Sequence, residues 1–105
     1  MQLSEEESYY AVIFTSKQTE HHSGYAEMAN QMEELAKLQP GYLGMDHARS
    51  ELGITISYWK NEPAILNWKN QTDHLIAQNK GKRHWYSAYS VRVCKVEREY
   101  HFNKY

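Results

Sequence analysis

The sequence has little cysteine, since its 105 residues contain only Cys94. A single cysteine cannot form an intramolecular disulfide, and it cannot supply the thiolates of a zinc site. Cys94 stands in a valine-rich, strand-like run, which favours a buried and inert thiol over a nucleophile. His21 and His22 are adjacent in a polar segment without cysteine or carboxylate at ligand spacing. A bound metal is therefore not expected.

The sequence also lacks an excess of positive charge, because 12 basic residues face 13 acidic ones and the net charge is -1. Binding to nucleic acid depends largely on positive charge, so nucleic acid is not an expected partner. The basic group Lys80, Lys82, Arg83 and His84 is interpreted as a solvated turn. Its stretch "NKGKR" has one glycine, which excludes a nucleotide-binding fingerprint.

Long apolar runs are absent as well. No segment approaches the length that spans a membrane,. The first residues, "MQLSEEESYY", are acidic and lack the apolar core of a signal peptide,. The sequence therefore predicts a cytoplasmic protein with no membrane partner.

Aromatic residues are abundant, with nine Tyr, three Trp and two Phe making up 13% of the chain. These side chains favour interfaces and ligand sites, where an apolar surface also needs a polar edge. A chain of this length forms one domain, expected over residues 1–105 with a core at about 9–102.

The hydrophobic patterns predict six elements in the order strand, helix, strand, strand, helix, strand. Strands are expected over residues 9–15, 41–50, 54–59 and 85–99, and helices over 25–38 and 64–81. Ser23 is expected to cap the first helix and Asn61 the second, while "QPG" at residues 39–41 ends the first. The second helix is expected to break near Gln71 and Thr72, with Asp73 capping its last part.

Two strand–helix–strand halves predict an α+β, ferredoxin-like split βαβ fold, in which one antiparallel sheet carries both helices on one face. The other face would then expose many aromatic and apolar groups. Pairing with the same face of a second copy is the usual solution, so we expect a homodimer. The last strand is longer than the typical five to six residues and should reach beyond its own sheet.

Three segments resemble the antibiotic biosynthesis monooxygenase (ABM) domain family: "QPGYLGMDHARSELGITISYW", "AILNWKNQTDHLIAQNKG" and "WYSAYSVRVCKVEREYHF". The resemblance extends from about residue 9 to 102 in the same order of elements. It implies a dimeric α/β barrel whose sheets pack face to face, with the last strand reaching into the partner. It also implies a small-ligand site in each protomer, between the sheet and the helices.

Members of this family include cofactor-free monooxygenases that act on polycyclic phenols and proteins that bind and degrade haem. The haem-degrading members have an Asn on the first strand, a Trp on the second helix and an iron-binding His ten residues later. Trp68 matches the Trp, but Gln78 stands at the position of the His and "YYAVIFT" has no Asn. His74, one helical turn before Gln78, could reach the iron of a shifted haem. Haem degradation is therefore the alternative function.

The cofactor-free function needs a base and a dry aromatic environment, because the substrate must lose a proton before it gives an electron to oxygen. His74 or His84 is the predicted catalytic base. Gln78 and Tyr58 are expected to donate hydrogen bonds to the substrate. The aromatic walls of the site are predicted to be Trp59, Trp68, Trp85 and Tyr86.

Each of these residues also has a purely structural interpretation. Trp59 and Trp68 could form the core, and Tyr86 could belong to the dimer interface. His74 and Gln78 could merely orient a ligand in a non-catalytic, small-ligand-binding dimer. The sequence leaves these alternatives open.

Overall fold

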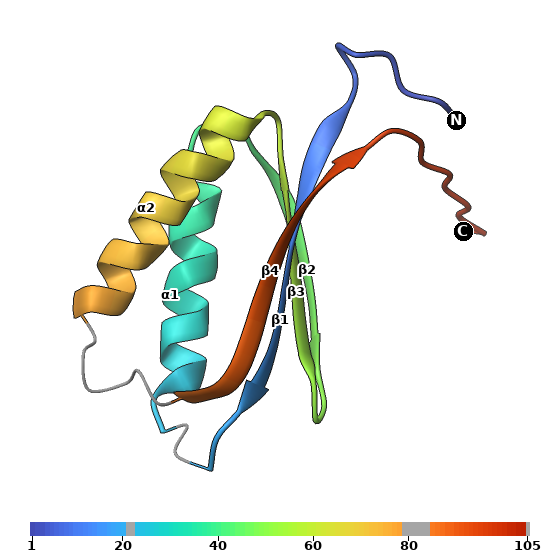
Figure 1. Cartoon of the computed structure of the whole chain (residues 1–105). Helices are drawn as coiled ribbons and strands as arrows, with labels where there is room; N and C mark the ends of the chain where they lie inside the picture. The colour runs from blue at the N-terminus through green and yellow to red at the C-terminus, as the bar shows by residue number, and fades with distance from the viewer. Residues whose placement is uncertain (21–22, 79–84, 105) are drawn as a thin grey trace.

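The computed structural model describes residues 1–20, 23–78 and 85–104, except for the side chains of residues 75–78. Its elements follow the predicted order: β1 Tyr9–Gln18, α1 Tyr25–Lys37, β2 Tyr42–Arg49, β3 Gly53–Trp59, α2 Glu62–Gln78 and β4 Tyr86–Val96. Both helices lie on the same side of the sheet (Figure 1). The predicted α+β, ferredoxin-like class is confirmed.

The four strands form one antiparallel sheet in the order β2-β3-β1-β4. Paired residues on neighbouring strands point to the same face. Trp59 and Ser57 are buried, and their partners on β1 are Tyr10 and Val12. We call this face, which carries the helices, the helix side.

The opposite face, which we call the open face, carries no helix (Figure 1). Tyr58, Ile56 and Ile54 of β3 point to it, together with their β1 partners Ala11, Ile13 and Thr15. Ile54 is 38% exposed. This half-exposed apolar surface matches the uncovered face that the sequence predicted.

The core lies on the helix side, where α1, α2 and β3 meet. Its fully packed members are Ala36, Trp59, Ala64 and Trp68. Partly buried residues from both helices and from strands β1 and β2 surround this group: Val12, Met32, Leu35, Tyr42, Met45 and Ile65. The two alanines let the helices approach the sheet closely, so that the two large indoles fill the space between them.

The two helices begin differently. At α2, the Asn61 side chain accepts a hydrogen bond of 2.9 Å from the Ala64 backbone N–H, which confirms the predicted cap,. At α1 the cap residue is Gly24, with φ 86°, and no side chain caps the helix. The prediction that Ser23 caps α1 is wrong. The chain enters the helix through Gly24 in a left-handed backbone conformation, which glycine adopts readily,. The helix ends at Lys37, as the "QPG" stop predicted.

Helix α2 is continuous from Glu62 to Gln78, so the predicted break near Gln71 and Thr72 is wrong. Asp73 does not cap a second helix, because it pairs with Lys69 one turn earlier at 2.8 Å. The Thr72 hydroxyl donates to the Lys69 carbonyl at 2.9 Å. Both contacts satisfy polar side chains within a helix that continues past them.

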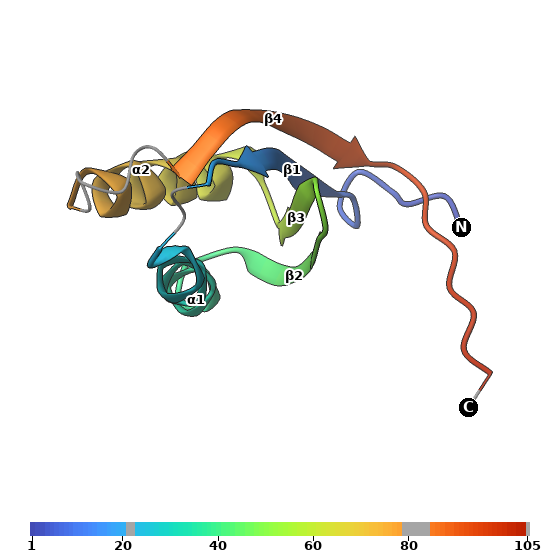
Figure 2. The same ribbon diagram turned by 90° about the horizontal axis from the view of Figure 1, so that it is seen from below.

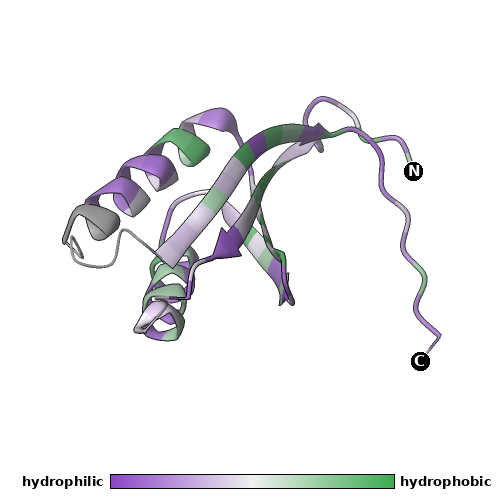
Figure 3. Ribbon diagram, turned by 60° about the horizontal axis from the view of Figure 1, so that its bottom comes forward, coloured by the Kyte–Doolittle hydropathy of each residue, from purple (hydrophilic) through white to green (hydrophobic). Residues whose placement is uncertain are grey.

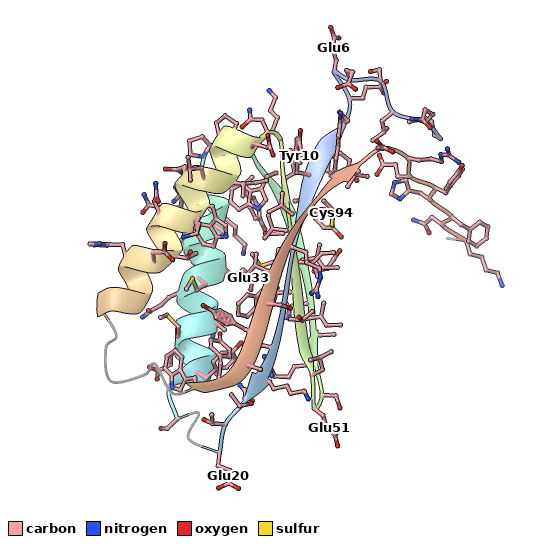
Figure 4. All side chains as sticks on the ribbon, viewed as in Figure 1. Glu6, Tyr10, Glu20, Glu33, Glu51 and Cys94 are labelled. Atoms are coloured by element: carbon pink, nitrogen blue, oxygen red, sulfur yellow. The ribbon has the colours of Figure 1, made fainter. Side chains whose placement is uncertain are left out.

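Cys94 is exposed, so the prediction of a buried thiol is wrong. Its partner on β1 is Ala11, which places Cys94 on the open face of an edge strand. The side chain lies on the side of the sheet away from the helices (Figure 4). The surrounding valines suggested burial, but Val91 and Val93 are themselves about half exposed.

Strand β4 is 11 residues long, and the chain just beyond it pairs with the N-terminal residues. The bridge joins Gln2 to Arg98, and the Met1 amino group donates to the Glu99 carbonyl at 2.7 Å. The last residues then run away from the sheet and helices (Figures 1 and 2). The long last strand is thus confirmed, ending at Val96.

Hydropathy is distributed unevenly over the elements. Helix α2 is mostly hydrophilic, whereas much of β4 is hydrophobic (Figure 3).

Within the part of the chain that the structure describes, no helix has the length and apolar character needed to cross a membrane.

Candidate functional site

Three rings gather on the helix side where β1 ends and β4 begins. The centroid of Phe14 is 5.5 Å from that of Tyr86 and 5.5 Å from that of Tyr89. The Tyr86 and Tyr89 rings are 5.9 Å apart. These spacings are typical of favourable aromatic pairs.

A β-bulge makes this grouping possible. Regular alternation would turn Tyr86 and Tyr89, three residues apart, to opposite faces of the sheet. The register of β1 against β4 shifts between Lys17 and Gln18, so that Gln18 pairs with Tyr86. The bulge inserts one extra residue into β4 and brings both tyrosines to the helix side.

Two more aromatic residues extend the group to the start of α1. The Tyr25 ring makes edge contacts with Trp85, at 5.7 Å, and with Tyr86, at 5.6 Å. Trp85 is 4% exposed, and its Nε1 donates to the Ser23 carbonyl at 3.0 Å. We call these five residues the aromatic cluster: Phe14, Tyr25, Trp85, Tyr86 and Tyr89.

One cation lies against this cluster. Arg49, at the end of β2, places its guanidinium 5.3 Å from the centre of the Tyr25 ring. Its Nη2 donates to the Ser16 hydroxyl at 2.5 Å and to the Tyr25 hydroxyl at 3.4 Å. A guanidinium over an aromatic face is a favourable contact.

Tyr86 is held in its neutral form. Burial raises the pKa of its phenol above the usual value, and a hydrogen bond with Tyr25 raises it further. The charge of Arg49 opposes these effects but is smaller. Near neutral pH the cluster therefore presents a neutral phenol beside a permanent cation,.

The other two tryptophans form the core. Trp59 is fully buried, and Trp68 is 9% exposed and stacks on it with ring centroids 5.6 Å apart. The Trp59 Nε1 donates to the Ser57 hydroxyl at 2.8 Å. Trp59 and Trp68 are therefore core residues, which is the structural alternative that the sequence left open for them.

Tyr58 lies on the open face, so it cannot share a site with Trp59 on the helix side. Its hydroxyl donates to Asp46 at 2.8 Å, which raises the pKa of the phenol. It borders an open hollow of about 410 Å³ that is lined by Tyr9, Leu43, Asp46, Tyr58 and His101.

A short chain of polar contacts closes one edge of this hollow. The Tyr9 hydroxyl donates to Glu99 at 2.5 Å, and Glu99 lies 3.2 Å from the His101 Nε2. The hydrogen bond to the Glu99 carboxylate raises the pKa of Tyr9 to about 12, with burial adding to the effect. The same bond lowers the pKa of Glu99.

Of the two predicted bases, the structure describes His74, which is not a member of the aromatic cluster. The His74 side chain is exposed on α2, among exposed neighbours such as Asp73 and Asn70. His84 and the side chain of Gln78 lie outside the described residues. Among the residues that the structure describes, no group of three or more His, Cys, Asp or Glu side chains could hold a metal ion.

Of the predicted site residues, the structure brings Trp85 and Tyr86 together in the aromatic cluster, and it stacks Trp68 on Trp59 in the core. Sequence reasoning missed Phe14, Tyr25 and Arg49 as members of the same group. Arg49 did carry a signal, because Met45, His47 and Arg49 alternate on β2 and so share one face,. That face could be identified only once the register against β3 was known.

Comparison with known proteins identifies the relatives of this chain. The chain is 47% identical over 96 residues to the uncharacterised protein YqjZ of Bacillus subtilis strain 168, which covers 90% of this chain and 84% of YqjZ. No family model matches the sequence.

Solved structures share the fold at low sequence identity. The cofactor-independent oxygenase SnoaB from Streptomyces nogalater, crystallised as a mutant, has a TM-score of 0.71 at 9% identity, over 87% of this chain and 95% of SnoaB. PA3566 from Pseudomonas aeruginosa has a TM-score of 0.67 at 17% identity, over 92% of this chain and all of that chain. A candidate antibiotic biosynthesis monooxygenase from Nitrosomonas europaea has a TM-score of 0.66 at 15% identity, over 93% and 96%. The chain therefore belongs to the family of YqjZ, and its fold is that of the antibiotic biosynthesis monooxygenases.

Proposed function

We propose that the chain is a cofactor-independent monooxygenase that oxidises an aromatic or polycyclic small molecule at the aromatic cluster. The observation that carries the proposal is the grouping of Phe14, Tyr86 and Tyr89, which Tyr86 joins to the Tyr25 ring. The guanidinium of Arg49 lies over that ring. Flat aromatic rings bind a flat aromatic substrate, and the cation stabilises negative charge that develops on it. SnoaB, which shares the fold, is a cofactor-independent oxygenase.

The proposed reaction begins with loss of a proton from a phenol or quinol. The resulting anion gives one electron to dioxygen, and the radical pair recombines at a carbon that bears hydrogen to give a peroxide anion. This anion takes the first proton back from the base and becomes a hydroperoxide. Loss of water then leaves a carbonyl, so one oxygen atom enters the product and the other leaves as water. The protein must accept the first proton, exclude water and stabilise the anion.

We assign the proton-accepting role to His84, which precedes Trp85 of the cluster in the sequence. An imidazole titrates near neutral pH and suits this task. His74, the other predicted base, is exposed on α2, and this position gives it no support as the base. For the same reason it gives no support to the haem-degrading alternative, in which His74 would bind the iron.

We also propose that the protein is a homodimer whose protomers pack through their open faces. Ile54 and Leu43 are 38% and 53% exposed, and both belong to this face. Two such faces would cover one another, as an isologous contact requires.

Oxygen uptake tests the proposed activity. Metal-free and flavin-free protein is mixed with a panel of polycyclic phenols and quinols in an oxygen electrode. We expect oxygen uptake to be lost in His84→Ala and reduced in Tyr86→Phe. The matched variant Tyr100→Phe should keep the wild-type rate, because Tyr100 is 77% exposed in the C-terminal segment. Binding of the panel without any uptake would instead identify a non-catalytic ligand-binding protein.

A further inference from the structure

We infer that the ligand of the aromatic cluster carries an anionic oxygen, a carboxylate or phenolate on an aromatic ring, and that Arg49 is the residue that selects it. This inference rests on the proposed function for the location of the site. It goes further in naming the chemical class of the ligand and the residue that recognises it.

The guanidinium reaches the cluster by crossing the sheet. Arg49 starts on β2, passes over Gly53 of β3, and ends at Ser16 of β1 and Tyr25 of α1. The Ser16 side chain is 2% exposed, so the group that anchors Nη2 is itself fixed by packing. The guanidinium is thus oriented before a ligand arrives.

Gly53 makes this path possible. A Cβ atom at position 53 would lie 2.0 Å from Nη2 of Arg49 and 2.2 Å from its Cζ. Atoms cannot approach so closely, so any larger residue would displace the end of the arginine side chain. Gly53 and Ser16 are therefore positioning residues for the guanidinium.

The charge of Arg49 has no acidic partner in the described part of the chain. The ion pairs there involve Lys37, Lys69, Lys95 and His101. The contacts of Arg49 are to two hydroxyls and one ring, all neutral, and they occupy Nη2. Its Nε and Nη1 donate from different edges of the guanidinium, so each can form a separate charge-assisted hydrogen bond to an anionic oxygen.

The aromatic neighbours complete the recognition. Tyr86 contacts both Tyr25, which lies under the guanidinium, and Phe14. A ligand ring against Phe14 and Tyr86 would place an attached anionic oxygen toward the cation. Neutral aromatic molecules of the same shape would gain the ring contacts alone.

A pair of matched probes tests the inference: naphthalene-2-carboxylate and naphthalene-2-carboxamide, which differ chiefly in charge. Affinities are measured by calorimetry on the full chain at neutral pH. We expect the carboxylate to bind at least about tenfold more tightly, because a charge-assisted pair outweighs a neutral hydrogen bond. Arg49→Gln should remove this preference, and Arg49→Lys should restore part of it.

Two further variants separate recognition from folding. Gly53→Ala should reduce the preference without altering any group that touches the ligand. Arg98→Gln, a matched loss of an arginine whose Nε donates to Gln2, should keep it. Circular dichroism establishes that each variant is folded, and a structural role of Arg49 alone would lower stability without changing the affinity ratio.

Equal binding of the two probes, absence of binding by both, or an unchanged ratio in Arg49→Gln would overturn the inference. Its failure is distinguishable from that of the proposed function. Preferential binding without oxygen uptake would refute the oxygenase and support the anion site. Oxygen uptake with equal binding of the two probes would support the oxygenase and refute the anion site.

Discussion

At the scale of single residues, a substitution of Trp68 tests whether its indole belongs to the core or to a ligand site. It is 9% exposed and stacks on Trp59. We predict that Trp68→Ala lowers the free energy of unfolding by about 3–5 kcal/mol, as removal of a large buried aromatic ring does. Urea denaturation followed by circular dichroism measures this loss.

The exposed side of the same helix supplies the control for Trp68. Leu66 is 61% exposed, so Leu66→Ala should change stability by less than about 0.5 kcal/mol,. A similar small cost for both substitutions would mean that Trp68 does not belong to the core.

The Tyr9–Glu99 hydrogen bond gives a pH-dependent contribution to stability. The bond lowers the pKa of Glu99, so its contribution is present above the ordinary carboxyl value of 4.5 and is lost as the pH falls,. It raises the pKa of Tyr9 to about 12, so the contribution is present below the ordinary phenol value of 10.0 and is lost as the pH rises toward 12,.

We therefore predict that Tyr9→Phe lowers the Tm most between those two ordinary pKa values, with a difference from wild type that shrinks on either side. Thermal melts across the pH range measure it, and an NMR titration should show the pKa of Glu99 returning toward its usual value. The control is Tyr100→Phe, which removes the same hydroxyl from a residue that is 77% exposed. A pH-independent difference would contradict this account.

At the scale of elements, the two helix starts make a matched pair. The Asn61 side chain caps α2, whereas no side chain caps α1. We predict that Asn61→Ala lowers the free energy of unfolding by about 1 kcal/mol, because the Ala64 N–H loses its acceptor. Ser23→Ala should be close to neutral in the same denaturation experiment, and an equal loss in both variants would contradict the assignment.

The elements could be predicted from the sequence to within a few residues because their hydrophobic periods and stop signals are local. The alternation in β3 and the Asn61 cap are examples. The predicted break in α2 was wrong because Asp73, a common cap residue, is also a good partner for Lys69 four positions earlier. Sequence pattern alone does not distinguish these two uses of one side chain.

The candidate site was much less predictable than the fold. Trp85 and Tyr86 attracted attention as aromatic residues, but their grouping with Phe14 depends on a bulge in β4. The approach of Arg49 depends on the register of β2 against β3 and on the space above Gly53. Register and bulges arise from tertiary pairing, which a single sequence does not reveal.

At the scale of the whole molecule, the open face predicts the assembly. We expect the protein to sediment at twice the 12.4 kDa mass of one chain. Ile54→Asp should shift it to the monomer mass, because a carboxylate buried between two sheets has no partner there. The control Leu66→Asp, on the outer surface of α2, should remain dimeric, and a wild-type monomer at micromolar concentration would contradict the proposed dimer.

The same scale decides which face of the sheet binds the ligand. The helix side offers the aromatic cluster and Arg49, and the open face offers the hollow between Tyr9 and Tyr58. The most direct measurement is a crystal structure of the protein with naphthalene-2-carboxylate. Our account predicts the ring against Phe14 and Tyr86, with the carboxylate paired to Arg49. A ligand seated in the open-face hollow, with the aromatic cluster unchanged, would contradict it.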